Sequence, residues 1–316
     1  MYDTLNLRLY ADDVGNNVSL VEEIPTYLDQ ITGEHNYAGY VIVTGKLGTL
    51  DVSVSRLRIK VFNNSFAKYY FSDPYSVMGR KDMQGCLEKL SDELHLNMGK
   101  AEVCRLDFGQ NFVMKSDTNI YLQHLGELKR PAATRLPQSD GLYYSGRNTQ
   151  LAFYNKNREQ SRQGNPIPEL YKGRQVLRYE YRFLHRLPEE LGVARVTANM
   201  LYEENFYMRL IDTWKKSFEA IQKINDINLN FDMIRTKKEL YRLSLLHLIE
   251  QRGGQMAFTN SVVEAAKRGK ITAKQKHDLL GAIEDACKVD DSGLVVENET
   301  IKELEDKIKQ ATKFYR

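Results

Sequence analysis

The chain has 316 residues, of which 42% are apolar and 28% charged, and its formal net charge is +3. These fractions are typical of a soluble globular protein with a sizeable core. The longest apolar runs, such as residues 40–43, are too short to span a bilayer, and the N-terminal segment lacks the pattern of a signal peptide. Three scattered cysteines have neither disulfide nor zinc-site spacing, so we expect a cytoplasmic protein without a disulfide framework.

Five segments in the first two thirds of the chain alternate apolar and polar residues, which is the period of a half-buried β-strand. They are residues 4–10, 56–62, 101–109, 150–156 and 176–183. Residues 82–94 instead space their apolar side chains for a helix. Period-2 strands of this kind indicate an antiparallel sheet with one packed face and one polar face.

The pattern becomes helical after residue 197, beginning with residues 204–221. Three later helices are predicted to open with capping boxes, formed by Thr236 with Glu239, Thr272 with Gln275, and Thr300 with Glu303. Gly253 and Gly254 are expected to end the first of them. We therefore predict an α+β chain with an antiparallel sheet and helices on one face in residues 1–196, followed by a mainly helical region in residues 197–316.

Basic residues are concentrated in one part of the chain. Residues 126–186 contain twelve Lys and Arg against five Asp and Glu, a surplus that suits a polyanion such as DNA. A solvated arginine-rich surface explains the same composition, and composition alone favours that alternative.

The polar sides of the predicted strands bring together residues with complementary chemistry. If the strands share a sheet, one face collects Asp107, Tyr154, Lys156, Arg178, Glu180 and Arg182. A tyrosine hydroxyl attacks phosphate poorly unless it is assisted, and a divalent metal held by carboxylates can orient the scissile bond. Mg²⁺ and Mn²⁺ prefer such oxygen ligands.

This face can be interpreted in two ways. In the catalytic interpretation Asp107 and Glu180 bind the metal, Tyr154 is the nucleophile, and Lys156 and Arg178 stabilise the charge that develops on the phosphate. In the structural alternative Tyr154 is a packing residue and the two acids pair with arginines across the strands.

Four segments carry a resemblance to known proteins. "MYDTLNLRL", "CRLDFG", "QLAFYNKNRE" and "LRYEYRF" occur in the order seen in filamentous-phage replication initiators of the gene II/X type, and the last three also resemble rolling-circle plasmid initiators of the Rep_trans type. The resemblance covers roughly the first 190 residues. It implies an HUH-endonuclease-like Rep domain without the His motif, in which Asp107 and Glu180 are the acids, Tyr154 is the nucleophile, and Lys156 and Arg178 flank them.

The sequence also departs from these relatives. They often carry a glutamate on the strand that matches residues 56–62, where this chain has Arg58 and Lys60. The histidines are isolated, so the His-hydrophobic-His metal motif is absent; they are His35, His95, His124, His185, His247 and His277. The acidic variant of the metal site is therefore the one expected.

The resemblance implies a rolling-circle replication initiator that nicks one origin strand, leaving a 5′-phosphotyrosine and a free 3′-OH, and later rejoins the strand. It further implies Mg²⁺ or Mn²⁺, origin DNA, a host helicase and polymerase, a homodimer, and the cytoplasm of a bacterial host, with no membrane. The predicted DNA contacts are Arg105, Arg147, Arg158 and Arg182. A relaxase or transposase with the same chemistry, and a DNA-binding regulator without catalysis, are the alternatives.

One further pattern lies in the helical region. Residues 260–286 could form two short helices around "RGKIT", as in a helix-turn-helix, with Arg268, Lys270, Lys274 and Lys276 near phosphates. A helical hairpin with a polar turn is the alternative.

Overall fold

The computed structural model describes residues 1–15, 19–37, 39–62, 65–128, 134–139 and 141–316. The chain divides into two compact units. Unit 1 comprises residues 1–118, 130–220 and 308–316, and unit 2 comprises residues 119–129 and 221–307. These bounds differ from the predicted division of the chain into residues 1–196 and 197–316. That the two predicted parts have separate functions stays a prediction.

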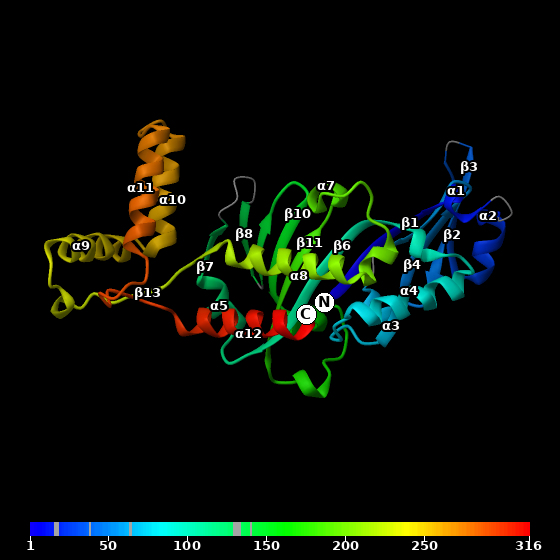
Figure 1. Cartoon of the computed structure of the whole chain (residues 1–316), viewed down its shortest axis with the longest axis horizontal. Coiled ribbons are helices and arrows are strands. Elements are labelled where there is room, and N and C mark those ends of the chain that lie inside the picture. Colours follow the sequence, from blue (N-terminus) through cyan, green and yellow to red (C-terminus); the bar gives the residue numbers. More distant parts are fainter. Residues whose placement is uncertain (16–18, 38, 63–64, 129–133, 140) are drawn as a thin grey trace. The chain divides into compact units, whose positions relative to one another are not determined.

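Unit 1 is built on a ten-stranded sheet whose neighbouring strands all pair antiparallel (Figure 1). The strands, in their order across the sheet, are β2 (Gln30–Tyr37), β3 (Tyr40–Leu47), β4 (Leu50–Ser55), β5 (Arg58–Phe62), β1 (Tyr2–Tyr10), β6 (Glu102–Met114), β11 (Gln175–Phe183), β10 (Thr149–Asn155), β9 (Gly141–Ser145) and β8 (Thr134–Gln138). The predicted antiparallel sheet is therefore confirmed, and all five predicted strands belong to it.

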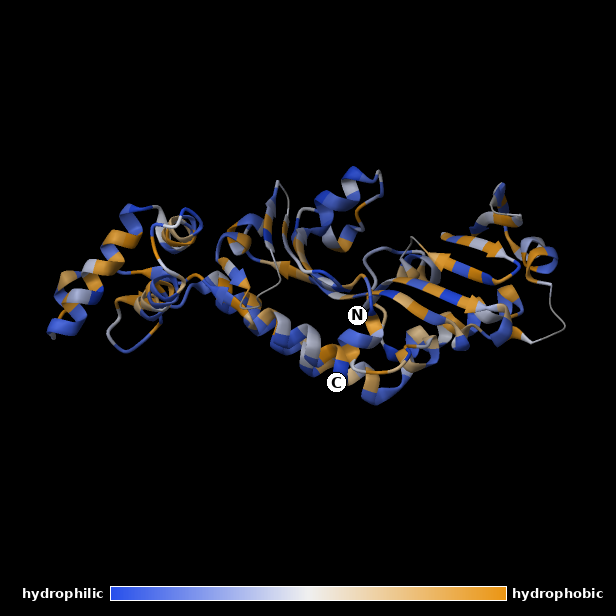
Figure 2. Ribbon diagram, turned by 90° about the horizontal axis from the view of Figure 1, so that it is seen from above, coloured by the Kyte–Doolittle hydropathy of each residue, from blue (hydrophilic) through white to orange (hydrophobic). Residues whose placement is uncertain are grey.

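Alternation of hydropathy along the strands accounts for the packed face of the sheet. Leu5, Leu7 and Leu9 of β1 are buried, and the colours alternate along the strands in Figure 2. Helices in unit 1 cover this apolar surface. They are α3 (Phe66–Phe71), α4 (Arg80–Leu94) and α8 (Glu204–Glu219).

Helix α8 packs on the part of the sheet formed by β10 and β11. The ring of Trp214 stacks on Tyr179 at 4.9 Å between centroids, and Tyr179 stacks in turn on Phe153 at 4.4 Å. The Tyr179 hydroxyl donates to the Trp214 carbonyl at 2.8 Å. These aromatic contacts fix the apolar side of β10 and β11, so the polar residues of both strands must point to the opposite side.

Short elements complete unit 1. They are α1 (Ala11–Val14), α2 (Leu20–Glu23), η1 (Ile24–Tyr27), η2 (Met98–Lys100), α6 (Lys156–Arg162), η3 (Glu169–Tyr171), α7 (Leu187–Leu191) and η4 (Ala198–Tyr202). No helix among the described residues is long and apolar enough to cross a membrane.

Unit 2 is mainly helical. Its elements are most of α5 (Thr118–Gln123), β7 (Leu125–Leu128), β12 (Ile221–Lys223), β13 (Asp226–Ile227), η5 (Phe231–Met233), α9 (Lys237–Gln251), α10 (Gly254–Lys267), α11 (Ala273–Ala286), β14 (Val295–Val296) and the first part of α12 (Glu299–Tyr315). Leu246 and Ile249 of α9 pack with Ile283 of α11 in its core. The predicted helical character of this region is confirmed.

Two of the three predicted capping boxes are confirmed. The side chains of Thr236 and Thr272 accept hydrogen bonds from the backbone N–H of Glu239 and Gln275, each at 3.2 Å. The third prediction is wrong. Helix α12 begins before Thr300, and the Asn298 carboxamide oxygen accepts the Thr300 N–H at 3.0 Å. Asparagine is as good a cap as threonine.

Candidate active site

The register of three central strands brings the predicted site residues together. Across β6 and β11, Asp107 lies opposite Arg182, Gly109 opposite Glu180, and Asn111 opposite Arg178. Across β11 and β10 the same three residues of β11 face Gln150, Ala152 and Tyr154. Because directly opposed residues of antiparallel strands share a face, these side chains form one polar cluster.

Glu180 is the centre of this cluster. Its Oε1 accepts the Tyr154 hydroxyl at 2.9 Å and also the Arg178 Nε–H, while its Oε2 accepts Arg182 Nε–H at 2.8 Å. Glu180 is 2% exposed. A buried carboxylate is tolerated only when it is paired and hydrogen-bonded, and here both oxygens are.

Small residues on both sides make room for the Glu180 side chain. Ala152 flanks it on β10 and Gly109 on β6. A Cβ at Gly109 would lie 2.7 Å from the Glu180 Cγ and 2.5 Å from the Tyr179 carbonyl oxygen, closer than van der Waals contact allows. The glycine in "LDFG" is therefore required by the packing of Glu180.

Arg178 links Glu180 to two residues that sequence reasoning missed. Its Nη2 donates to Asp3 at 2.5 Å and its Nη1 to Asn111 at 3.0 Å. Strict alternation would put Asp3 on the same side as Leu5, in the apolar layer. A bulge in β1 between Tyr2 and Leu5 shifts the alternation by one residue and turns Asp3 to the polar side.

Asp107 binds an arginine of its own strand. Arg105 donates from Nε at 3.0 Å and from Nη2 at 2.8 Å to the two carboxylate oxygens. Burial raises the pKa of Asp107 to about 6; Arg105 opposes the shift and the charge of Glu180 adds to it. The two carboxylates therefore lie close enough to repel each other.

Tyr154 is neutral in this arrangement. Burial first, and the negative charge of Glu180 second, raise the pKa of its hydroxyl well above the ordinary value. Burial alone would raise the pKa of Glu180 as well, but the charges of Arg182 and Arg178 hold it below its usual range. The hydroxyl is thus the donor and the carboxylate the ionised acceptor.

Lys156 lies on a helix and not on the strand that was predicted for it. The predicted strand 150–156 ends at Asn155, whose side chain accepts the Arg158 N–H at 3.0 Å and caps α6. Lys156 is therefore the first residue of a helix rather than a strand residue. It is buried, pairs with Glu159 at 3.0 Å, and its charge contributes to the low pKa of Glu180.

The polar face has a covered end and an open end. At the covered end the Tyr75 carbonyl accepts the Asn111 side-chain N–H at 3.0 Å, and the Tyr75 ring stacks on Tyr171 at 4.9 Å. At the open end the side chains of Arg105 and Arg182 are 32% and 21% exposed. Tyr154 itself is only 6% exposed, so the face predicted as polar is largely buried.

The other two predicted DNA contacts lie apart from the hydrogen bonds of the cluster. Arg147 is exposed in the turn between β9 and β10. Arg158 lies on α6 and pairs with Asp117 at 3.0 Å. Of the four arginines predicted to contact DNA, the structure therefore brings Arg105 and Arg182 to the predicted acids.

A second tyrosine lies on the same face. Tyr143 of β9 is opposite Ala152, it is half-buried, and the Arg182 guanidinium lies 5.9 Å from its ring centroid and 5.8 Å from that of Tyr154. Its neighbour Tyr144 is buried on the other side of the strand. Of this pair, only Tyr143 belongs to the polar face.

A divalent ion at the two predicted metal ligands, Asp107 and Glu180, would have few protein ligands. No three His, Cys, Asp or Glu side chains among the described residues form a metal-binding group. Asp107 and Glu180 remain as two repelling carboxylates, and Mg²⁺ is commonly held by one or two carboxylates together with water and substrate phosphates. A metal bound there would replace hydrogen bonds from Arg105 and Arg182.

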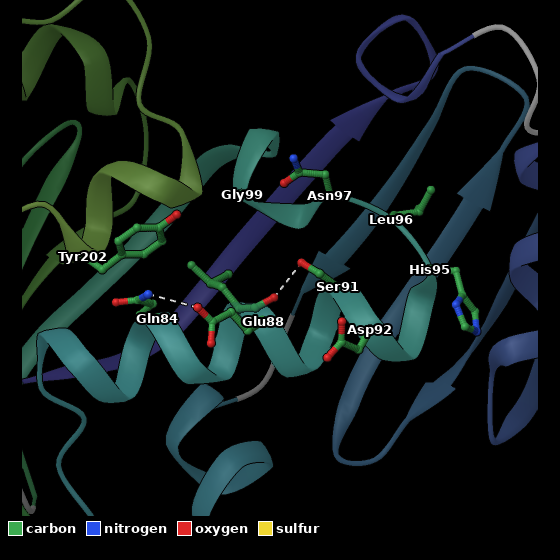
Figure 3. Close-up of a pocket in the computed structure, with 10 residues that line it drawn as sticks. Gln84, Glu88, Ser91, Asp92, His95, Leu96, Asn97, Gly99 and Tyr202 are labelled. Atoms are coloured by element: carbon green, nitrogen blue, oxygen red, sulfur yellow. Dashed lines mark hydrogen bonds between the residues drawn. The ribbon is translucent and has the colours of Figure 1, made fainter.

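A surface pocket of about 460 Å³ in unit 1 is a weaker candidate (Figure 3). It is lined by residues of α4, of the following segment 95–97, of η2 and of η4, and none of them belongs to the polar cluster. Glu88 and Asp92 are among the lining residues, and Glu88 accepts the Gln84 side-chain N–H at 2.9 Å. Two carboxylates in its lining make it unsuited to a phosphate backbone.

Comparison with known families identifies the class of protein. The family model for the N-terminal part of the phage replication-associated protein of gene II matches residues 1–214, which include the whole sheet. The chain therefore belongs to this family, that of the filamentous-phage gene II type replication initiators, and the resemblance seen in the sequence is confirmed. The family supports a role in initiating rolling-circle replication, which implies binding to origin DNA. A search of the curated proteins found no match.

The contacts of Arg178 generate a stability prediction. Arg178→Met leaves the Asp3 carboxylate without its ion-pair partner and removes one of the buried partners of Glu180, so the free energy of unfolding of unit 1 should fall by ~3–5 kcal/mol. Urea unfolding followed by the fluorescence of Trp214, the one tryptophan, measures this. Lys172→Met removes an exposed ion pair with Glu169 and is the control, with a change below ~0.5 kcal/mol. A decrease below ~1 kcal/mol in Arg178→Met would contradict the assignment.

The packing of Gly109 generates a second prediction. Gly109→Ala should lower the free energy of unfolding by ~1–3 kcal/mol, because the added methyl group displaces Glu180 or the β11 backbone. The matched control is Gly99→Ala, where the nearest atom is the movable Asn97 side-chain oxygen at 3.1 Å. Equal stability of the two variants by the Trp214 assay would show that the close approach at Gly109 is not a constraint.

Proposed function

We propose that this protein is a metal-dependent, site-specific nickase-ligase that initiates rolling-circle replication with Tyr154 as its nucleophile. The observation that carries the proposal is the hydrogen bond from the Tyr154 hydroxyl to Glu180 inside a group of arginines. Membership of a replication-initiator family, whose proteins are generally endonucleases, supports the reaction class.

The proposed reaction is a transesterification. The Tyr154 oxygen forms a bond to phosphorus, the bond from phosphorus to the 3′ oxygen breaks, and the proton lost by the tyrosine is balanced by one taken up by the 3′ oxygen. The products are a 5′-phosphotyrosine and a free 3′-OH. Attack by a 3′-OH on the phosphotyrosine reverses these steps and rejoins a strand, because one ester bond replaces another.

The cluster would direct this reaction through position and charge. Glu180 orients the hydroxyl, but its low pKa makes it a weak base, so loss of the tyrosine proton requires positive charge nearby. Arg178 and Arg182 supply that charge, since both oppose the rise of the Tyr154 pKa. The same guanidiniums would stabilise negative charge on the phosphate.

Access to Tyr154 would come from the open end of the polar face. Arg182 lies beside the Tyr154 ring and is partly exposed, whereas Arg178 is buried. A DNA phosphate would attract Arg105 and Arg182 away from the carboxylates and so uncover the tyrosine. In this proposal the two arginines bind DNA, as predicted, after leaving Asp107 and Glu180.

A divalent ion completes the proposed site. Asp107 and Glu180 would hold Mg²⁺ or Mn²⁺, which supplies charge that polarises the scissile phosphate. Lys156 would remain close to Glu180 as electrostatic support. A host helicase and polymerase belong to the proposal because the parental strand must be unwound and the free 3′-OH extended. A homodimer belongs to it because the resemblance to plasmid initiators implies one.

The nucleophile is tested with a nicking assay on supercoiled DNA that carries the origin of the protein's own replicon, with Mg²⁺ or Mn²⁺. Tyr154→Phe keeps the ring and should abolish both nicking and the covalent protein–DNA adduct, because only the attacking oxygen is removed. Tyr143→Phe is the matched variant on the same face and should retain both.

Other outcomes separate the alternatives. Loss of the adduct in Tyr143→Phe alone would transfer the nucleophile to Tyr143. DNA binding without nicking by the wild type would favour the regulator. Cleavage and joining of transfer ends or hairpin DNA, but not of an origin, would favour a relaxase or transposase.

The metal site is tested by titration. Asp107→Asn should raise the Mn²⁺ concentration needed for half-maximal nicking by ~10-fold or more, because one of two protein carboxylates is removed. Asp117→Asn, which removes a carboxylate that pairs with Arg158, is the control and should leave this concentration unchanged. Undiminished nicking by wild type in excess chelator would show that no divalent ion is needed.

A further inference from the structure

A helical hairpin in unit 2 lies outside the residues that the family match covers. Helices α10 and α11 run side by side, joined by the turn at residues 268–272 (Figure 1). Their side-by-side course differs from the helix-turn-helix considered from the sequence, whose two helices would cross at a steep angle. The alternative considered from the sequence, a hairpin with a polar turn, describes the structure.

The fully buried residues of the hairpin lie at its base, and Phe258, Val262 and Leu280 pack against the same core while only partly buried. Ile283 and Ala286 of α11 are buried with Leu246 and Ile249 of α9. Toward the turn, α10 and α11 have no fully buried residue between positions 256 and 282. The tip therefore extends away from the core that supports the hairpin.

The tip is basic and the base is acidic. Five Lys and Arg flank the turn against two acids; the residues are Lys267, Arg268, Lys270, Lys274 and Lys276, with Glu264 and Asp278. Lys267 pairs with Glu264 at 2.8 Å. The structure shows no salt bridge from the other four basic residues to any residue it describes. Glu284 and Asp285 lie at the opposite end of α11.

Helix stability does not explain this arrangement. Lys267 and Arg268 stand at the C-terminal end of α10, where a cation is favourable. Lys274 and Lys276, however, lie in the first turn of α11, where the helix dipole disfavours positive charge, and that turn contains no acidic residue. Charges that cost helix stability and form no salt bridge with a described residue point to an external anion.

We infer that the tip of the α10–α11 hairpin binds the phosphate backbone of duplex DNA. A regularly charged polyanion matches four basic side chains clustered around one turn, and each phosphate contact releases counterions. The contact carries no base readout, so it would anchor the protein on duplex DNA independently of sequence. This inference rests on the proposed function, because it supplies affinity for the DNA that the tyrosine would cut.

The test uses the full chain and a short, fluorescently labelled duplex of random sequence. In the variant Arg268→Gln/Lys270→Gln/Lys274→Gln/Lys276→Gln, the dissociation constant from anisotropy should rise at least ~10-fold at low salt. The slope of log K against log salt should become shallower by about 1 for each phosphate that the variant no longer binds. Removing lysines from the first turn of α11 should leave its helicity by circular dichroism unchanged or higher.

A control with the same reduction of charge elsewhere in unit 2 separates position from net charge. Lys237→Gln/Lys238→Gln/Lys288→Gln/Lys302→Gln also removes four positive charges and should weaken binding by less than ~3-fold. Equal weakening in both variants, or an unchanged dissociation constant and salt slope in the hairpin variant, would overturn the inference. So would weakening seen only with a single-stranded oligonucleotide.

Failure of this inference can be distinguished from failure of the proposed function. Nicking at saturating protein reports on Tyr154, whereas duplex binding reports on the hairpin. A hairpin variant that binds duplex weakly but nicks normally when saturated supports both proposals. A wild type that binds duplex through the hairpin but never nicks would refute the nickase alone.

Discussion

The burial of one carboxylate constrains the middle of the sheet. Glu180 lies on a central strand with both oxygens engaged, and an ionised group in that position is costly unless its partners are buried with it. This requirement explains Arg178 beside it and the small residues Gly109 and Ala152 on either side. It also explains the bulge that turns Asp3 inward to share the charge of Arg178.

The packing of β10 and β11 on their apolar side also affects the position of Tyr154 relative to Glu180. On the other side of the strand, Tyr179 stacks between Phe153 and Trp214 and leaves β10 and β11 little freedom to slide. The distance between the Tyr154 hydroxyl and Glu180 is therefore set by aromatic contacts on the opposite face. A catalytic tyrosine on a rigid strand loses little freedom when a phosphate binds, which favours attack in a defined direction.

Local patterns predicted much of the site, and nonlocal contacts supplied the rest. Period-2 alternation predicted the strands and placed Asp107, Tyr154 and Glu180 on one face, which the register confirms. Asp3 was missed because a bulge breaks the alternation, and Lys156 was misplaced because Asn155 caps a helix. The burial of the polar face depends on Tyr75, distant in sequence, and no local pattern contains that information. The roles of these residues in catalysis stay predictions.

Unit 1 is assembled from segments that are far apart in the sequence, and this affects the order in which the chain can fold during its synthesis. Residues 308–316 belong to unit 1, and Arg316 forms an ion pair with Asp212 of α8. A ribosome makes the helices of unit 2 before it makes those residues, so unit 1 is still incomplete when α9, α10 and α11 emerge. Domains generally fold as they are synthesised, in order from the N-terminus. Here the sheet strands of unit 1 are made first, whereas its last segment, residues 308–316, would dock on α8 only after the helices of unit 2 have been made.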